Sequence, residues 1–291
     1  QGSQVVTTVR QESLVTLQPH GDQPPLFCIY GALIYHDLAR HLGTERPVYG
    51  VYLPEEVELL KAGQLTDSQT DLTSVADLAT RYLQEIRSIQ PQGPYFLASV
   101  SFGGLVAFEM AQQLELQGEK VALLALFDTE APGGLQKLPT RERLARHLNH
   151  LFREGPTYVL KKAGRHLNLS KKQLISSVSK IPSAVDQESG QAGLLYYHVK
   201  FSPNDIRQQI REEAAKNYMP RPYPGKVVLF RAMDRSGFEA YSDAQWGWGS
   251  LTTGGLEAHA IPGDHLGILK EPNVQVLAAK LKVCLEGVMQ F

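Results

Sequence analysis

The sequence predicts an α/β fold in which helices cover both faces of a mostly parallel central sheet. From about residue 24 to residue 134, short apolar runs alternate with stretches of helical spacing, the rhythm of parallel strands joined by helices. Val121–Phe127 is apolar at every position, which is typical of a strand in the middle of a parallel sheet. The rhythm stops after Gly134 and returns at Lys226, so that roughly eighty residues of helical pattern interrupt one core.

The individual elements follow from local signals taken in chain order. Each expected strand is a short apolar run, and each expected helix has apolar residues three or four positions apart. Ser74 is a typical helix N-cap, and Gly43 and Gly118 are typical helix ends. The first half is expected to contain a possible edge strand Ser13–Leu17, strand Leu26–Tyr30, helix Leu33–Leu42, strand Val48–Tyr52, helix Ser74–Ile89, strand Tyr95–Ala98, helix Phe102–Leu116 and strand Val121–Phe127.

The second half of the chain sets the expected domain boundaries. Helical patterns without intervening strands cover Arg141–Phe152, Thr157–Leu167 and Ile206–Asn217. The core resumes with strands Lys226–Arg231 and Leu256–Ile261 and a closing helix over about 272–288. We therefore expect a leader or linker at residues 1–23, a first core segment at 24–137, a helical lid insertion at 138–222 and a second core segment at 223–291.

Composition and charge exclude several classes of function. The 291 residues are 43% hydrophobic, and 29 Lys and Arg balance 30 Asp and Glu, which gives no overall electrostatic reason to expect nucleic-acid binding. The longest apolar runs fall far short of the ~20 residues of a membrane helix, and no signal peptide opens the chain. Cys28 and Cys284 are too few for a disulfide scaffold or a zinc cluster. We expect a cytoplasmic protein without a membrane or nucleic-acid partner.

The strongest local signal is the segment Tyr95–Gly104, in which a strand runs into Ser101 and two glycines open a helix. A serine on such a sharp turn exposes its oxygen in the field of the helix N-terminus, which suits a nucleophile. The turn needs small neighbours, and Gly103 is one of them. Ser99 stands where the G-x-S-x-G pattern has its first glycine. The alternative role for Ser101 is that of a helix N-cap.

A serine nucleophile needs a base, and the base needs an acid that orients it. Asp128 directly follows the apolar strand that ends at Phe127, which places a carboxylate at the edge of the sheet where ligands bind. Glu130 is the alternative acid, and Asp128 could instead cap a turn. Of nine histidines, only His265 follows a late core strand in a glycine-bounded loop. The order Ser101, Asp128, His265 is that of the α/β-hydrolase fold.

The negative oxygen of a tetrahedral intermediate needs two N–H donors. The backbone N–H of Phe102, at the expected helix start, is the first. The second is expected in the loop after the first core strand, where Gly31 and Ala32 are the candidates and Ala32 is preferred. No metal or nucleotide site is expected, because the sequence has no H-E-x-x-H motif, no Walker loop and no ligand-spaced Cys/His cluster.

The chain resembles the type I thioesterase domains that terminate synthesis on nonribosomal peptide and polyketide synthases. The segments that carry this resemblance are Leu14–Cys28, Ala98–Gly104, Leu126–Pro132, Ile261–His265 and Leu269–Asn273. The resemblance implies an α/β-hydrolase fold with a lid over the acyl channel, and a serine thioesterase that forms an acyl-enzyme at Ser101. It also implies a substrate presented on the phosphopantetheine of an acyl or peptidyl carrier protein of the same megasynthase. It implies no bound cofactor, and release by hydrolysis or macrocyclisation.

Two departures from the family pattern concern the oxyanion site. After the first strand the family usually has His-Gly or His-Pro followed by Ala-Gly-Gly, whereas this chain has Tyr30-Gly-Ala and continues into Leu33. The first glycine of the serine turn is replaced by Ser99. We expect these changes to affect oxyanion geometry, rate and acyl selectivity more than the class of reaction.

The expected lid carries an excess of positive charge. Between Lys137 and Lys172 there are ten basic residues and two acidic ones. Helices of this charge above a catalytic mouth would attract an acidic carrier protein, and Arg141, Arg146 and Lys162 are the candidate docking residues. The alternative is an ordinary solvated helix face.

Two other functions compete with chain release. One is a free-standing type II editing thioesterase, against which the long insertion and the linker-like leader argue. The other is a catalytically weak carrier-docking domain, which the shortened oxyanion loop and Ser99 would favour.

Overall fold

In a computed structural model, the described residues are 13–56, 73–133, 206–234, 243 and 245–288. The chain divides into two compact units, and the first contains every helix and strand described below. The second comprises Leu135–Gly190 and Ser236–Asp243, of which the structure describes Asp243. The expected lid helices Arg141–Phe152 and Thr157–Leu167, and with them Arg141, Arg146 and Lys162, therefore lie outside the described residues.

The core is a seven-stranded sheet in the order β1-β3-β2-β4-β5-β6-β7. Its strands are β1 Leu14–Gln18, β2 Leu26–Ile29, β3 Val48–Val51, β4 Tyr95–Val100, β5 Val121–Phe127, β6 Val227–Ala232 and β7 Leu256–Ile261. All neighbouring strands are parallel except the edge strand β1, which pairs antiparallel with β3. The predicted mostly parallel sheet is confirmed.

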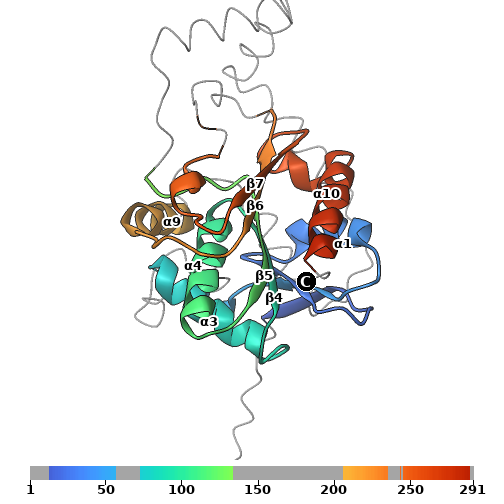
Figure 1. The fold of residues 1–291 in the computed structure, drawn as a ribbon, viewed down its shortest axis with the longest axis horizontal. Coiled ribbons are helices and arrows are strands. Elements are labelled where there is room, and N and C mark those ends of the chain that lie inside the picture. The colour runs from blue at the N-terminus through green and yellow to red at the C-terminus, as the bar shows by residue number, and fades with distance from the viewer. Residues whose placement is uncertain (1–12, 57–72, 134–205, 235–242, 244, 289–291) are drawn as a thin grey trace, which may run out of the picture. The chain divides into compact units, whose positions relative to one another are not determined.

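Helices cover both faces of this sheet, as predicted (Figure 1). On one face α1 (His36–Leu42) packs against α10 (Asn273–Gly287), and on the other α3 (Val75–Arg87) packs against α4 (Phe102–Leu116). The helix α9 (Ile206–Asn217) contacts α4 and lies in the same compact unit as the sheet. This helix lies near the end of the segment 138–222, which the sequence predicts to be the lid insertion. The bounds of that insertion stay a prediction.

Local sequence explains most element boundaries. The Ser74 hydroxyl accepts a hydrogen bond from the Asp77 N–H at 3.0 Å, the N-cap contact predicted for α3. The predicted helix Leu33–Leu42 is divided into a 3₁₀ turn, Leu33–Tyr35, and α1, because the two helix types share similar apolar spacing over a few residues. β4 continues two residues beyond Ala98, since its pairing with β5 extends to Val100.

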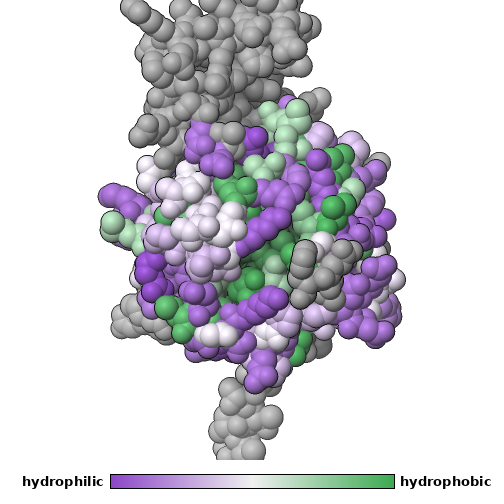
Figure 2. Space-filling view, in the orientation of Figure 1, coloured by the Kyte–Doolittle hydropathy of each residue, from purple (hydrophilic) through white to green (hydrophobic). Residues whose placement is uncertain are grey.

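The strands in the middle of the sheet are fully enclosed by the two helix layers. Every residue of β2 and β4 is buried, whereas β7 at the edge is only partly buried. Figure 2 shows hydrophobic side chains near the middle of one face, over the sheet, within a predominantly hydrophilic rim.

No described helix has the length and apolar character needed to cross a membrane.

The strand order fixes where a site can form. From β2 the chain crosses to β3 on one side of β2 and then returns to β4 on the other side. In an open α/β sheet the carboxyl ends of two strands at such a reversal border the crevice where ligands bind. The segments that follow β2 and β4 are Tyr30–Ala32 and Ser101, so the reversal brings two of the predicted site segments together.

Candidate active site

Ser101 stands on a sharp turn between the end of β4 and the start of α4. Its backbone has φ 58°, a value uncommon for a residue with a side chain. Its N–H donates to the carbonyl of Phe127 at 3.0 Å, which ties the turn to the end of the neighbouring strand β5. This geometry matches the turn that presents a serine oxygen at a helix N-terminus.

The two glycines after Ser101 are needed for space. A Cβ atom at Gly103 would lie 2.3 Å from Ser99 Oγ and 2.5 Å from Tyr30 Cβ. A Cβ atom at Gly104 would lie 2.1 Å from Thr129 Oγ1. These distances are far inside van der Waals contact, so side chains from neighbouring segments fill the places that larger residues would need.

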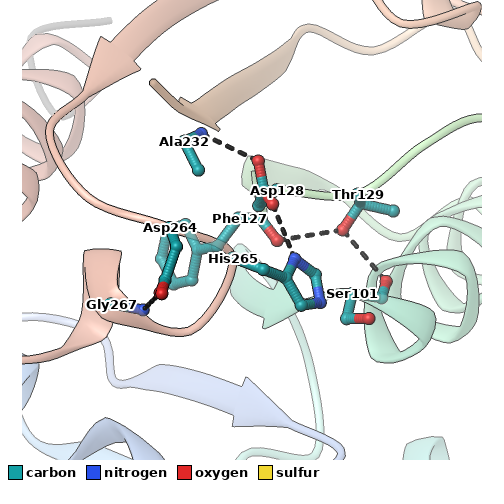
Figure 3. A network of polar contacts seen from close by, with 8 residues as sticks. All are labelled: Ser101, Phe127, Asp128, Thr129, Ala232, Asp264, His265 and Gly267. Atoms are coloured by element: carbon teal, nitrogen blue, oxygen red, sulfur yellow. Dashed lines mark hydrogen bonds and ion pairs between the residues drawn. The ribbon is translucent and has the colours of Figure 1, made fainter. Parts of the chain in front are cut away.

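Asp128 directly follows β5 and is a deeply buried ionisable group, with 1% of its surface exposed. Its Oδ1 atom accepts a hydrogen bond from the Ala232 N–H at 2.7 Å, and its Oδ2 atom lies 2.6 Å from His265 Nδ1 (Figure 3). A buried carboxylate is stable only when its oxygens are paired, and these two partners satisfy one oxygen each.

His265 follows β7 and brings a third chain segment to the site. Since the carboxylate of Asp128 is an acceptor, Nδ1 of His265 carries the proton and Nε2 is left as an acceptor. In the view of Figure 3 the imidazole lies between Asp128 and Ser101. Among the described residues no hydrogen bond joins His265 to the Ser101 hydroxyl, and such contacts are often long before substrate binds.

The candidate oxyanion donors differ in whether their N–H groups already have a hydrogen-bond partner. The N–H of Gly31 donates to the carbonyl of Val51 at 3.0 Å and is therefore already used. Within the described part of the chain no hydrogen bond engages the N–H of Ala32. Phe102 is the first residue of α4, a position whose N–H has no partner inside the helix. This distribution favours Phe102 and Ala32 as a pair of donors, which stays a prediction.

The side-chain contacts of the histidines and acids indicate which of them can act as the catalytic base and the acid that orients it. His41 pairs with Glu271 at 2.5 Å, and His259 pairs with Glu257 at 2.9 Å. The ring of His265 contacts the carboxylate of Asp128, which favours Asp128 over the alternative acid Glu130.

Thr129 is a residue of the site that sequence reasoning missed. Its hydroxyl donates to the carbonyl of Ser101 at 3.0 Å, and its own carbonyl accepts from the Trp248 ring N–H at 2.9 Å. The contact with Ser101 therefore holds the serine turn against the segment after β5 (Figure 3). Its position directly after Asp128 is the only signal that the sequence offers.

One group of potential metal ligands occurs within the described residues. Glu257 and His259 on β7 and Cys284 on α10 bring their ligand atoms within 4.8 Å of one another. The Glu257 carboxylate already pairs with the Lys226 ammonium at 2.6 Å and with His259. A cation there would have to displace an ammonium group, so the arrangement is explained as an ion-pair network.

Comparison with known proteins agrees with this geometry. A family model described as "Thioesterase domain" matches residues 24–282. Malpibaldin synthetase of Mortierella alpina is 28% identical over 90% of this chain, which covers 4% of that protein. In eight of the curated relatives the chain spans between 2% and 13% of the relative's length, and these eight include nonribosomal peptide synthetases and a polyketide synthase.

Solved structures share the fold. The covalent complex of the NocB thioesterase domain with a fluorophosphonate nocardicin G analogue matches 94% of this chain and 99% of that chain. Its TM-score is 0.56 and its sequence identity 24%. The surfactin-cyclising thioesterase domain SrfTE matches 94% of this chain and 96% of that chain, with a TM-score of 0.57 and 18% identity. The predicted α/β-hydrolase fold is thus confirmed.

Proposed function

The chain belongs to the thioesterase domain family, as its motifs predicted, and we propose that it releases an acyl, polyketide or peptidyl chain from a carrier protein. The chain to be released reaches the site as a thioester of the carrier's phosphopantetheine and forms an acyl-enzyme at Ser101. The observation that supports this most is the 2.6 Å contact between His265 and the buried carboxylate of Asp128, at the sheet edge that carries Ser101.

Acylation uses the three side chains in turn. Nε2 of His265 takes the proton from the Ser101 hydroxyl while the serine oxygen attacks the thioester carbonyl. The N–H groups of Phe102 and Ala32 stabilise the negative oxygen of the tetrahedral intermediate. When the intermediate collapses, the imidazolium gives its proton to the departing thiol of phosphopantetheine. Asp128 stays ionised throughout and stabilises the imidazolium.

Release repeats these steps with a new nucleophile. His265 removes a proton from water, or from a hydroxyl or amine of the bound chain, and that group attacks the acyl ester. Water gives a free acid, and an internal nucleophile gives a ring. SrfTE cyclises the lipopeptide antibiotic surfactin, and both outcomes are compatible with the same catalytic groups here.

The carrier protein is the partner that this reaction requires. The relatives are multidomain synthases, which supports delivery by a carrier domain of the same assembly. We place docking on the basic residues Arg141, Arg146 and Lys162, on the strength of the charge excess in the sequence. A merely docking role for the domain is disfavoured, because the contact between Asp128 and His265 supports a working catalytic base.

The test is to incubate the protein with small acyl thioesters that mimic the phosphopantetheine arm and to follow its intact mass. We expect an acyl adduct on the peptide that contains Ser101, followed by loss of the adduct as acid or ring. Ser101→Ala should form no adduct, because no oxygen remains on the turn. The control Ser88→Ala removes an exposed hydroxyl that bonds to the Glu85 carbonyl and should acylate normally. A normal burst of acylation in Ser101→Ala would refute the proposal.

A further inference from the structure

Two buried hydroxyl groups join the ends of β2 and β4, just before the turns that carry the oxyanion loop and the nucleophile. Ile29 is the last residue of β2 and precedes the loop 30–32. Val100 is the last residue of β4 and precedes Ser101. The strands are neighbours in the sheet, and Ile29 lies opposite Ser99 in their register. The spacing between these two strand ends sets the spacing between the two turns.

Tyr35 bridges the two strand ends. It is completely buried, its hydroxyl donates to the Ile29 carbonyl at 2.9 Å, and its oxygen accepts from the Val100 N–H at 3.1 Å. Burial raises the pKa of the Tyr35 hydroxyl well above its usual range. The group therefore stays protonated and able to donate at any pH at which an imidazole base works.

Ser99 adds a second bond to the same carbonyl. Its side chain is also completely buried, and its hydroxyl donates to the Ile29 carbonyl at 2.7 Å. The residue that departs from the glycine of the family pattern thus has a defined partner. The Ile29 carbonyl, which can accept two hydrogen bonds, thus accepts one from each hydroxyl.

The turns that follow are in unfavourable backbone conformations. Tyr30 has φ 64° and Ser101 has φ 58°, and each directly follows a residue held by these hydroxyls. Such conformations persist at functional sites only where the surrounding structure fixes them. On its far side the loop is held by the bond from the Gly31 N–H to the Val51 carbonyl.

We propose that Tyr35 and Ser99 form a clamp that positions the oxyanion loop against the nucleophile turn, and so sets the separation of the Ala32 and Phe102 N–H donors. The clamp rests on the proposed function, since an oxyanion must form at Ser101 for it to matter. Both hydroxyls bond to backbone groups of the strand ends, so both are positioning residues. The loop 30–32 lacks the Ala-Gly-Gly of the family pattern, and the clamp holds this shorter loop in position.

The expected effects follow from which bonds remain. Removal of a whole oxyanion donor lowers kcat by about 10²- to 10³-fold, so displacement of a donor that is still present should cost less. We expect Tyr35→Phe, which leaves the Val100 N–H without its partner and the Ile29 carbonyl with the Ser99 bond alone, to lower kcat by roughly 10- to 100-fold. Ser99→Ala leaves the Tyr35 bonds and should lower kcat by up to about tenfold. The double variant should lower kcat by more than the product of the two single fold-losses, because the Ile29 carbonyl then has neither partner.

The experiment measures two rates on each variant: phosphonylation of Ser101 by a neutral fluorophosphonate, and turnover of a small acyl thioester. Both reactions place a negative oxygen between the same two N–H donors. We expect the two rates to fall together, with KM and the pH profile unchanged, because the contact between Asp128 and His265 is untouched. The matched control is Tyr95→Phe, which removes a buried tyrosine's bond to the Gln90 carbonyl at the opposite end of β4.

The possible outcomes distinguish failure of the clamp from failure of the proposed function. The clamp is wrong if folded Tyr35→Phe and Ser99→Ala proteins react at the parental rate, or if they lose no more than Tyr95→Phe at equal loss of Tm. If the parental protein is phosphonylated but turns over no thioester, the proposed function fails and the phosphonylation rates still decide on the clamp. If Ser101 of the parental protein is not phosphonylated at all, both are overturned.

Discussion

Replacing Asp128 by asparagine tests the catalytic acid, because the structure defines a partner for each oxygen of its carboxylate. The two side chains have nearly the same shape, so the fold should persist. The asparagine oxygen can accept from the Ala232 N–H, as Oδ1 of Asp128 does now. The NH₂ group then faces Nδ1 of His265, which must become an acceptor. The proton moves to Nε2, and the imidazole loses the lone pair that takes the proton from Ser101.

The size of the loss can be bounded from these contacts. The same inverted tautomer lowers kcat by about 10⁴-fold in serine protease triads, about 5 kcal/mol in the barrier. The flipped amide would keep the tautomer but would set two donors against each other at Ala232, at a cost of ~1–3 kcal/mol for a buried unpaired group. Such a cost alone lowers the active population by roughly 5- to 150-fold, and the negative charge is lost as well. We expect kcat to fall by about 10²- to 10⁴-fold.

Single-turnover acylation followed by intact mass is the assay, with urea unfolding of the same protein to check that the fold is intact. The control is Glu130→Gln, which changes the neighbouring carboxylate and should react at nearly the parental rate. If Asp128→Asn acylates normally while Glu130→Gln is slow, Glu130 is the acid and the assignment of Asp128 is wrong.

Three further results are expected. Gly103→Ala should lower the free energy of unfolding by ~1–3 kcal/mol in a urea titration, because its Cβ would meet Ser99 Oγ at 2.3 Å. Gly287→Ala, at the end of α10 with open space around it, should not lower the free energy, since alanine favours the helix. His265→Ala should slow acylation by several orders of magnitude in stopped-flow measurements. It should also lower Tm, because one oxygen of the buried Asp128 carboxylate loses its His265 partner. Reversing Arg141, Arg146 and Lys162 to Glu should lower kcat/KM for a carrier-bound acyl chain but not for a small uncharged thioester. Added salt should likewise lower kcat/KM of the parental protein for the carrier-bound chain only, because salt screens the attraction between the two proteins. Equal losses on both substrates, or none on either, would show that docking lies elsewhere.

Much of the fold was predictable because its signals are local. Apolar runs, the Ser74 cap and the glycines after helices mark the elements within a few residues, and each strand and helix expected in the described core is present. The positions of Ser101, Asp128 and His265 were also predictable, since each directly follows a strand or lies in the loop after one. The carboxyl ends of parallel strands share one edge of a sheet.

What the sequence could not show depends on contacts between distant segments. The Tyr35 hydroxyl bonds to a residue 65 positions away, and the Ser99 hydroxyl to one 70 positions away. In the sequence Tyr35 is one more apolar residue of a helix, and Ser99 is a departure from a pattern. Only the strand order, in which β2 and β4 are neighbours, gives both hydroxyls the same carbonyl as a partner.

The close fit between Gly104 and Thr129 restricts how this site can evolve. A Cβ at position 104 would lie 2.8 Å from the Cβ of Thr129, so even an alanine at 129 leaves no room. A lineage must first reach glycine at 129 before any side chain is tolerated at 104. That first step deletes the hydroxyl that bonds to the Ser101 carbonyl, so the serine turn loses this contact before any side chain can enter at 104. Residue 104 should therefore stay glycine in every descendant that keeps a side chain at 129.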